Sequence, residues 1–178
     1  MRSDVFTMLA VLALVLGGCA VERTVLEDSA VDAYPGYDAE LDFWDELATR
    51  PVVTNNDALY GLLLVSGEDS PPASYEDRLA AARALGWMNE NDAPPMNESA
   101  TLGFIAVAVC DILDLKGGLT MHLFGPSGRY CTRELVYREY FPSRTEDQSL
   151  SGLEFVDLLS RVETDVRPPA EKETEAGP

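Results

Sequence analysis

Histidine and lysine are almost absent from this chain of 178 residues. The single histidine is His122 and the two lysines are Lys116 and Lys172, so arginine supplies most of the 13 basic side chains. Against them stand 31 acidic side chains, which give a formal net charge of −18. Because a field of this sign repels phosphate backbones, we expect no nucleic-acid partner.

The residue patterns of common catalytic and metal sites are missing as well. His122 has no second histidine for zinc ligation, and residues 125–128 lack the spacing of a nucleophile elbow. Residues 89–92 offer oxygen ligands but lack the glycine and terminal glutamate of a calcium loop. We therefore predict no catalytic residue, no metal and no cofactor. The alternative is a carboxylate-based hydrolase or lyase, although the acids are too numerous for any pair to stand out.

No apolar run reaches the roughly 20 residues that a membrane-spanning helix needs. Residues 5–16 form an apolar run of twelve residues after Arg2, which fits a secretory signal peptide over residues 1–18. The run ends in Leu16-Gly17-Gly18-Cys19, which resembles the lipobox of bacterial lipoproteins. The simpler interpretation is an ordinary secretory signal that ends in a cysteine.

The lipoprotein resemblance covers only residues 1–19, but it has consequences for location. It implies cleavage before Cys19, acylation of this cysteine and attachment of the chain to a membrane of the bacterial cell envelope, on the periplasmic or cell-surface side. Several acyl chains on one residue give firm attachment, because each buried CH₂ contributes about 0.8 kcal/mol.

Only two other cysteines occur, Cys110 and Cys131. Outside the cytoplasm such a pair favours a disulfide, which would close a loop of about twenty residues and contribute on the order of 3 kcal/mol. The alternative is two separate small buried side chains. Their spacing differs from Cys-x-x-Cys, so a redox-active pair of that kind is not expected.

The mature chain divides into three parts. Residues 19–37 show no sustained hydrophobic period and are predicted to form the lipid anchor and a flexible tether. Residues 38–165 are predicted to form a single domain. Residues 166–178 are polar and flanked by prolines, so a disordered acidic tail is expected there.

Hydrophobic spacing in the domain predicts a mainly α fold of about six helices. The first helix places Leu41, Trp44, Leu47 and Ala48 on one face and ends at Pro51. The other helices are expected over residues 58–65, 75–85, 102–113, 129–140 and 151–162. The one extended stretch that the sequence indicates is residues 119–124.

Polar residues before the apolar segments indicate where these helices begin. Thr54, Ser74 and Ser151 each stand three residues before an acid, the spacing of a capping box. Asn97 or Ser99 is the expected cap of the helix over residues 102–113, and Gly86 is the expected C-terminal cap after residue 85.

Two segments of the domain, residues 74–116 and 128–163, echo each other. The matching positions are Tyr75, Arg78, Arg83, Leu102, Phe104 and Ile105 in the first and Tyr130, Arg133, Arg138, Leu153, Phe155 and Val156 in the second. Each unit reads as helix, polar loop and helix, and two such units would share a core. The alternative is a coincidence between amphipathic helices.

Residues 81–87, a proline-containing loop and residues 100–113 loosely resemble the S-layer homology module, a helix–loop–helix repeat of envelope proteins. This resemblance implies docking to cell-wall polymer or to neighbouring envelope proteins. The stretch that opens the second helix, residues 97–100, lacks the arginine of the family signature, so no binding residue is carried over.

The densest polar and aromatic cluster provides a candidate interaction face, formed by Arg129, Tyr130, Arg133 and Arg138. The same segment is expected to form ion pairs along its helix. The sequence thus predicts a lipid-anchored cell-envelope protein with a helical domain that serves as a non-catalytic binding or structural module.

Overall fold

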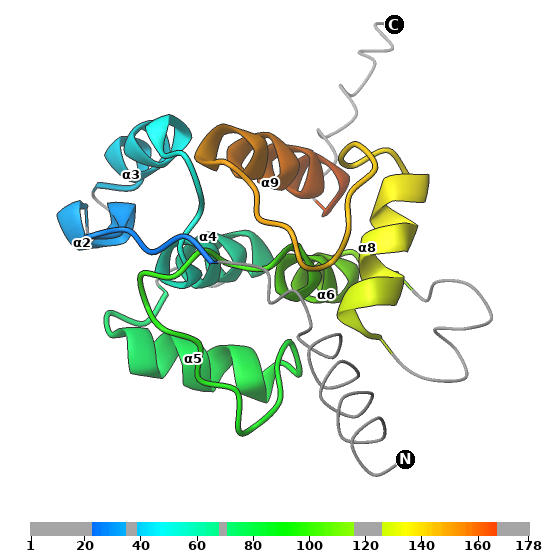
Figure 1. The fold of residues 1–178 in the computed structure, drawn as a ribbon, viewed down its shortest axis with the longest axis horizontal. Coiled ribbons are helices and arrows are strands. Elements are labelled where there is room, and N and C mark those ends of the chain that lie inside the picture. The colour runs from blue at the N-terminus through cyan, green and yellow to red at the C-terminus, as the bar shows by residue number, and fades with distance from the viewer. Residues whose placement is uncertain (1–22, 35–38, 68–70, 116–125, 167–178) are drawn as a thin grey trace, which may run out of the picture.

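The computed structural model describes residues 23–34, 39–67, 71–115 and 126–166, and seven helices carry the fold in these ranges (Figure 1). The helices are α2 (Ala30–Ala33), α3 (Glu40–Thr49), α4 (Asn55–Ser66), α5 (Tyr75–Ala84), α6 (Leu102–Ile112), α8 (Gly128–Tyr137) and α9 (Gly152–Val166). Within these ranges the β pairing is limited to two isolated bridges, between Val25 and Glu98 and between Thr54 and Ser99. The predicted mainly α fold is confirmed.

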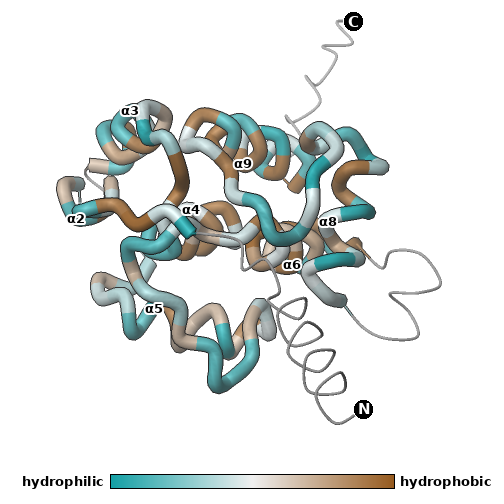
Figure 2. Tube along the Cα trace, viewed as in Figure 1, coloured by the Kyte–Doolittle hydropathy of each residue, from teal (hydrophilic) through white to brown (hydrophobic). Residues whose placement is uncertain are grey.

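Helix α4 lies at the centre of the core. Ten of its twelve residues are buried, and it packs against α2, α5, α6 and α9. A helix that is apolar on nearly every side must be covered on nearly every side. Hydrophobic residues accordingly gather along α4 and α6, with α5 on one side of them and α3 and α9 on the other (Figures 1 and 2).

The contact between α3 and α9 depends on a glycine. A Cβ atom at Gly152 would lie 1.6 Å from the carbonyl oxygen of Leu47, and the Gly152 N–H donates to the carbonyl of Arg50 at 3.0 Å. The first residue of α9 therefore lies directly against the last turn of α3.

A buried polar cluster surrounds the N-terminus of α4; we call it the α4 cap cluster. It contains seven of the eight buried polar or charged residues in the described ranges, namely Ser29, Thr54, Asn55, Asn56, Asp57, Arg78 and Ser99. Most of its polar atoms bond to one another or to the backbone, as burial of polar groups requires, and the Nε atom of Arg78 is the exception.

Hydrogen bonds within the α4 cap cluster connect four segments of the chain. Asp57 accepts from the backbone N–H of Val31 at 3.0 Å and from the hydroxyl of Thr54 at 2.8 Å. Asn56 donates to the hydroxyl of Ser29 at 2.7 Å and accepts from the guanidinium of Arg78. The cluster thus ties α4 to the residues around α2, to α5 and to the loop before α6.

The predicted tether is wrong for residues 23–34, which belong to the fold. Leu26 donates to the carbonyl of Asn97 at 3.0 Å, and Ser99 donates to the carbonyl of Thr24 at 2.7 Å. Ala30 and Val31 are buried in the core. This segment is a short extended stretch and a single helical turn, so it is too short to show a period and its burial depends on partners distant in sequence.

Most of the predicted helix starts are confirmed. Thr54 and Ser74 accept from the backbone N–H groups of Asp57 and Asp77, and Ser151 forms a capping box with Glu154.

The predicted cap of α6 is wrong, because Thr101 holds this position and accepts from the N–H of Phe104 at 3.1 Å. Ser99 is instead paired with Thr54 in a bridge. The predicted face of α3 is wrong in part, since Leu41 is 81% exposed whereas Phe43 and Leu47 are buried. Phe43 takes the core position because its ring packs edge-on against Tyr60 with centroids 4.8 Å apart.

The two segments that echo each other do not occupy equivalent environments. Leu102 is fully buried but Leu153 is 63% exposed, and Arg78 is buried whereas Arg133 is exposed. The most extensive packing joins α6 to α8 and α3 to α9, not the two helices of one unit. The shared sequence pattern therefore indicates that the helices are similar, but the matching residues do not occupy equivalent positions in the core.

Several predictions fall on residues outside the described ranges. They concern the signal peptide, Cys19, the extended stretch over residues 119–124, His122 and the tail beyond residue 166. Helix α9 itself continues to Val166, four residues beyond the predicted end.

Gly152→Ala should lower the free energy of unfolding by about 3 kcal/mol or more, because the new Cβ meets backbone that cannot move without separating α3 from α9. The matched control is Gly86→Ala, at a φ of +78° with open space around the site, which should cost only about 1–2 kcal/mol for the left-handed backbone. Urea unfolding measures both. Equal losses in the two variants would contradict the close approach of α3 and α9.

Asp57→Asn should change how stability depends on pH. Burial raises the pKa of Asp57 above its ordinary value of 3.8, so the folded chain binds this proton more tightly than the unfolded chain does. Its contribution to stability is therefore greatest at low pH and declines as pH rises from about 4 towards the raised pKa. As the pH rises across that window, the free energy of unfolding of the asparagine variant should therefore increase relative to that of the natural chain. Urea unfolding at several pH values tests this, and a pH-independent difference between the two proteins would contradict it.

Candidate functional site

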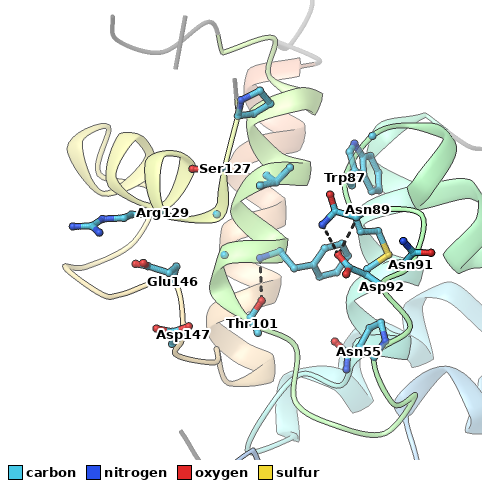
Figure 3. A pocket seen from close by; sticks show the side chains of 18 of the residues that line it. Asn55, Trp87, Asn89, Asn91, Asp92, Thr101, Ser127, Arg129, Glu146 and Asp147 are labelled. Carbon is cyan, nitrogen blue, oxygen red and sulfur yellow. Dashed lines mark hydrogen bonds between the residues drawn. The ribbon is translucent and has the colours of Figure 1, made fainter. Parts of the chain in front are cut away.

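A cleft of about 870 Å³ lies across the first turns of α6 (Figure 3). One wall is the segment after α5, with Trp87, Asn89, Asn91 and Asp92. The other wall comes from the start of α8 and the loop before α9, with Ser127, Arg129, Glu146 and Asp147. The partly buried side chains of Phe104 and Val107 on α6 supply apolar surface between them.

Two glycines bring α8 against α6 at this cleft. A Cβ atom at Gly128 would lie 3.0 Å from the Cα of Gly103, and one at Gly103 would lie 3.1 Å from the Cβ of Glu146. Because neither residue has a side chain, the two helix starts and the loop at Glu146 meet at backbone distance.

The second wall is fixed by the N-terminus of α6. The N–H groups of Leu102 and Gly103 donate to the carbonyls of Gln148 and Glu146 at 2.7 and 2.8 Å. Together with the Thr101 cap, these bonds use the first three free N–H groups of the helix. They hold the loop that carries Glu146 and Asp147 at the cleft.

The first wall is anchored through Trp87. This side chain is 3% exposed, and its indole N–H donates to the carboxylate of Asp111 on α6 at 2.8 Å. Gly86, at a φ of +78°, reverses the chain after α5 as the sequence predicted for a cap. Further along, Asp92 accepts from the backbone N–H and the amide of Asn89, at 3.2 and 2.8 Å. The exposed amide of Asn91 therefore stands on a supported loop.

The charge of the cleft is negative. Asp92, Glu146 and Asp147 line it, and Arg129 is the one basic residue among the described lining residues. Amides and the hydroxyls of Thr101 and Ser127 complete the polar lining, and Phe104 and Val107 supply apolar surface. Such a lining suits a neutral or positively charged ligand that carries hydrogen-bonding groups, whereas it disfavours a polyanion.

The predicted interaction face on α8 is only partly brought to this cleft. Arg129 lines it, Tyr130 is half-buried, and Arg133 is exposed one turn away. Arg138 lies just beyond the last residue of α8 and pairs with Glu134 at 2.8 Å. Of the four predicted residues only Arg129 therefore lines the cleft, and the expected ion pairing along the helix occurs at Arg138.

Cys110 on α6 and Cys131 on α8 are both buried and both free thiols in this structure. The thiol of Cys110 donates a hydrogen bond to the sulfur of Cys131, which lowers the pKa of Cys131 and raises that of Cys110. The two side chains are thus both buried, as the second of the two alternatives has it, but they are not separate, because they interact through this hydrogen bond.

Other candidate chemistry is limited in the described ranges. They hold no group of three or more histidine, cysteine or acidic residues that could bind a metal. Asp57 is the one buried carboxylate there, and its two oxygens accept from Val31 and Thr54. It belongs to the α4 cap cluster and not to the cleft.

Most of the cleft is not predictable from the sequence. Residues 89–92 are recognisable as a group of oxygen ligands, but nothing in the pattern connects them to Arg129 or to Glu146. Gly103 and Gly128 do indicate part of the site, because a glycine inside a regular element often marks a point where another backbone approaches closely.

None of the helices in the described part of the chain is both long enough and apolar enough to cross a membrane. No protein-family model, curated protein or solved structure matches the chain.

Proposed function

We propose that this chain is a bacterial lipoprotein, anchored in the cell envelope through Cys19, whose helical domain binds a neutral or cationic cell-wall polymer in the cleft over α6. The proposal combines the lipobox at residues 16–19 with the chemistry of the cleft. The observation that carries the binding role is this cleft of about 870 Å³ between two supported walls.

The arrangement of the walls supports binding of an extended ligand. They come from segments more than thirty residues apart in sequence, and each is fixed to α6 by hydrogen bonds. A site that is already held in place loses little conformational entropy when a ligand enters. Carbonyl and hydroxyl groups of a polymer can accept from Arg129 and Asn91, while its donors face the three carboxylates.

The cleft is proposed as a binding site without catalysis. The one buried carboxylate in the described ranges, Asp57, is engaged in holding the fold. The carboxylates of the cleft stand on its rim, with Asp92 and Asp147 exposed and Glu146 half-buried. A carboxylate-based hydrolase needs an acid whose environment sets it apart from its partner, and no observation singles out such a pair.

Cys19→Ser should move the protein from the membrane fraction to the soluble or unprocessed fraction, because the acyl chains attach to this thiol. Fractionation followed by mass spectrometry of the mature N-terminus measures both the location and the lipid. A conservative control is Cys110→Ser, which should leave the membrane fraction unchanged. If the natural protein carries no lipid at Cys19, the anchor is wrong whatever the domain binds.

Arg129→Ala should weaken binding to purified, insoluble cell-wall glycan by about five- to tenfold, the loss expected for one hydrogen bond from a charged donor. Asn91→Ala, on the opposite wall, should also weaken it. The matched control is Arg133→Ala, which removes an exposed arginine one turn along α8 and outside the cleft lining. Co-sedimentation of the detergent-solubilised chain with the glycan gives the affinities.

The outcomes separate the alternatives for this site. Equal weakening by Arg129→Ala and Arg133→Ala would assign binding to the exposed face of α8 instead of the cleft. Failure of the natural chain to sediment with the glycan would refute the polymer ligand, and in-cell crosslinking would then identify an envelope protein as the partner.

A further inference from the structure

Small residues face each other where α6 packs on α8. Along α6, Gly103, Ala106 and Cys110 follow at three- and four-residue intervals, which places them on one face of the helix. Along α8, Gly128 and Cys131 are three residues apart and share a face in the same way. The Gly103–Gly128 approach shows that these two faces meet.

The two cysteines lie within this contact. Cys110 is 2% exposed and Cys131 is fully buried. Their side chains touch through the thiol hydrogen bond, although the sulfurs belong to different helices and the residues are 21 positions apart. Two buried thiols that interact between separate helices are the groups that a disulfide between these helices would join, and the small neighbours allow the backbones to approach closely.

We propose that Cys110 and Cys131 form an intramolecular disulfide that links α6 to α8 when the chain folds in the presence of a disulfide oxidant. The structure with two free thiols then represents the reduced form. This inference does not depend on the cleft or its ligand, because it concerns only the contact between the two helices.

The chemistry of the pair gives the two sulfurs different roles. Cys131 lies in the first turn and a half of α8, where the positive end of the helix dipole favours a thiolate even before the two helices pack, so it makes the first attack. The Cys131 thiolate attacks one sulfur of a small disulfide such as oxidised glutathione, forms a mixed disulfide and releases one thiolate.

The second step closes the bond. The Cys110 thiol loses its proton to solvent and attacks the Cys131 sulfur of the mixed disulfide, which expels the second glutathione thiolate. In sum, two protein thiols lose two protons and two electrons, and the oxidant is reduced to two thiols. Because both sulfurs are buried in the folded chain, this exchange takes place before α8 has packed on α6, and the completed bond is then shielded from reductant.

The test uses the full chain, refolded in a buffer of oxidised and reduced glutathione and also recovered after export from cells. Unfolding in iodoacetamide without reductant, followed by proteolysis and mass spectrometry, identifies the blocked cysteines. We expect Cys110 and Cys131 to escape alkylation and to appear as one crosslinked peptide pair, about 2 Da lighter than the sum of the two thiol peptides. After dithiothreitol both should be alkylated.

Thermal unfolding supplies a second measurement. Reduction should lower the Tm of the natural chain by roughly 5–10 °C, because it restores the freedom of a loop of about twenty residues in the unfolded state. The double variant Cys110→Ser, Cys131→Ser should show no change with dithiothreitol. Cys19→Ser should keep the natural shift, which separates this bond from any bond that involves Cys19.

Three results would overturn the proposal. One is alkylation of both buried cysteines without prior reduction in the refolded and the exported chain. Another is a glutathione adduct that persists on Cys131 with no crosslinked pair, and the third is a crosslink from either cysteine to Cys19. Because the mass measurement uses the natural chain, it decides the question even if the serine variants do not fold.

Discussion

The N-terminus of α4 is the constraint on which the rest of this fold depends. Thr54, Asn55, Asn56 and Asp57 are all buried there, and each polar side chain must find a partner because water cannot reach it. The partners lie on α2, on α5 and on the loop before α6, so the cluster can be satisfied only when all of these segments are in place. A buried polar network costs stability when its hydrogen bonds are incomplete. The cluster therefore selects the arrangement of the helices in which those bonds form.

One wall of the candidate cleft depends on the same constraint. The loop that forms its first wall continues into residues 95–99, which are hydrogen-bonded to the start of α4 through Asn55 and Asn56. Its second wall is held by the free N–H groups of α6 and by the contact between Gly103 and Gly128. The cleft thus lies between segments that the core already fixes, which is the usual place for a preformed binding site.

The parts of the fold that could be predicted from the sequence are those whose cause is local. Thr54, Ser74 and Ser151 cap helices as expected, because a cap depends on an acid or a backbone N–H only three residues away. The sequence wrongly predicts a tether for residues 23–34, because the hydrogen bonds that hold this segment reach Asn97 and Asp57. It wrongly predicts a core position for Leu41 for a related reason, since spacing alone does not say which side of α3 meets α9.

Sequence by itself determined the helical class, most helix starts and the negative charge. Each of these depends on composition or on residues within one or two helical turns. Only the tertiary structure decided that residues 23–34 complete the core, that Cys110 and Cys131 touch, and that Asn91 and Arg129 line one cleft. Those contacts join positions that are tens of residues apart, and they are set by the packing of α6 against its neighbours, which no local pattern encodes.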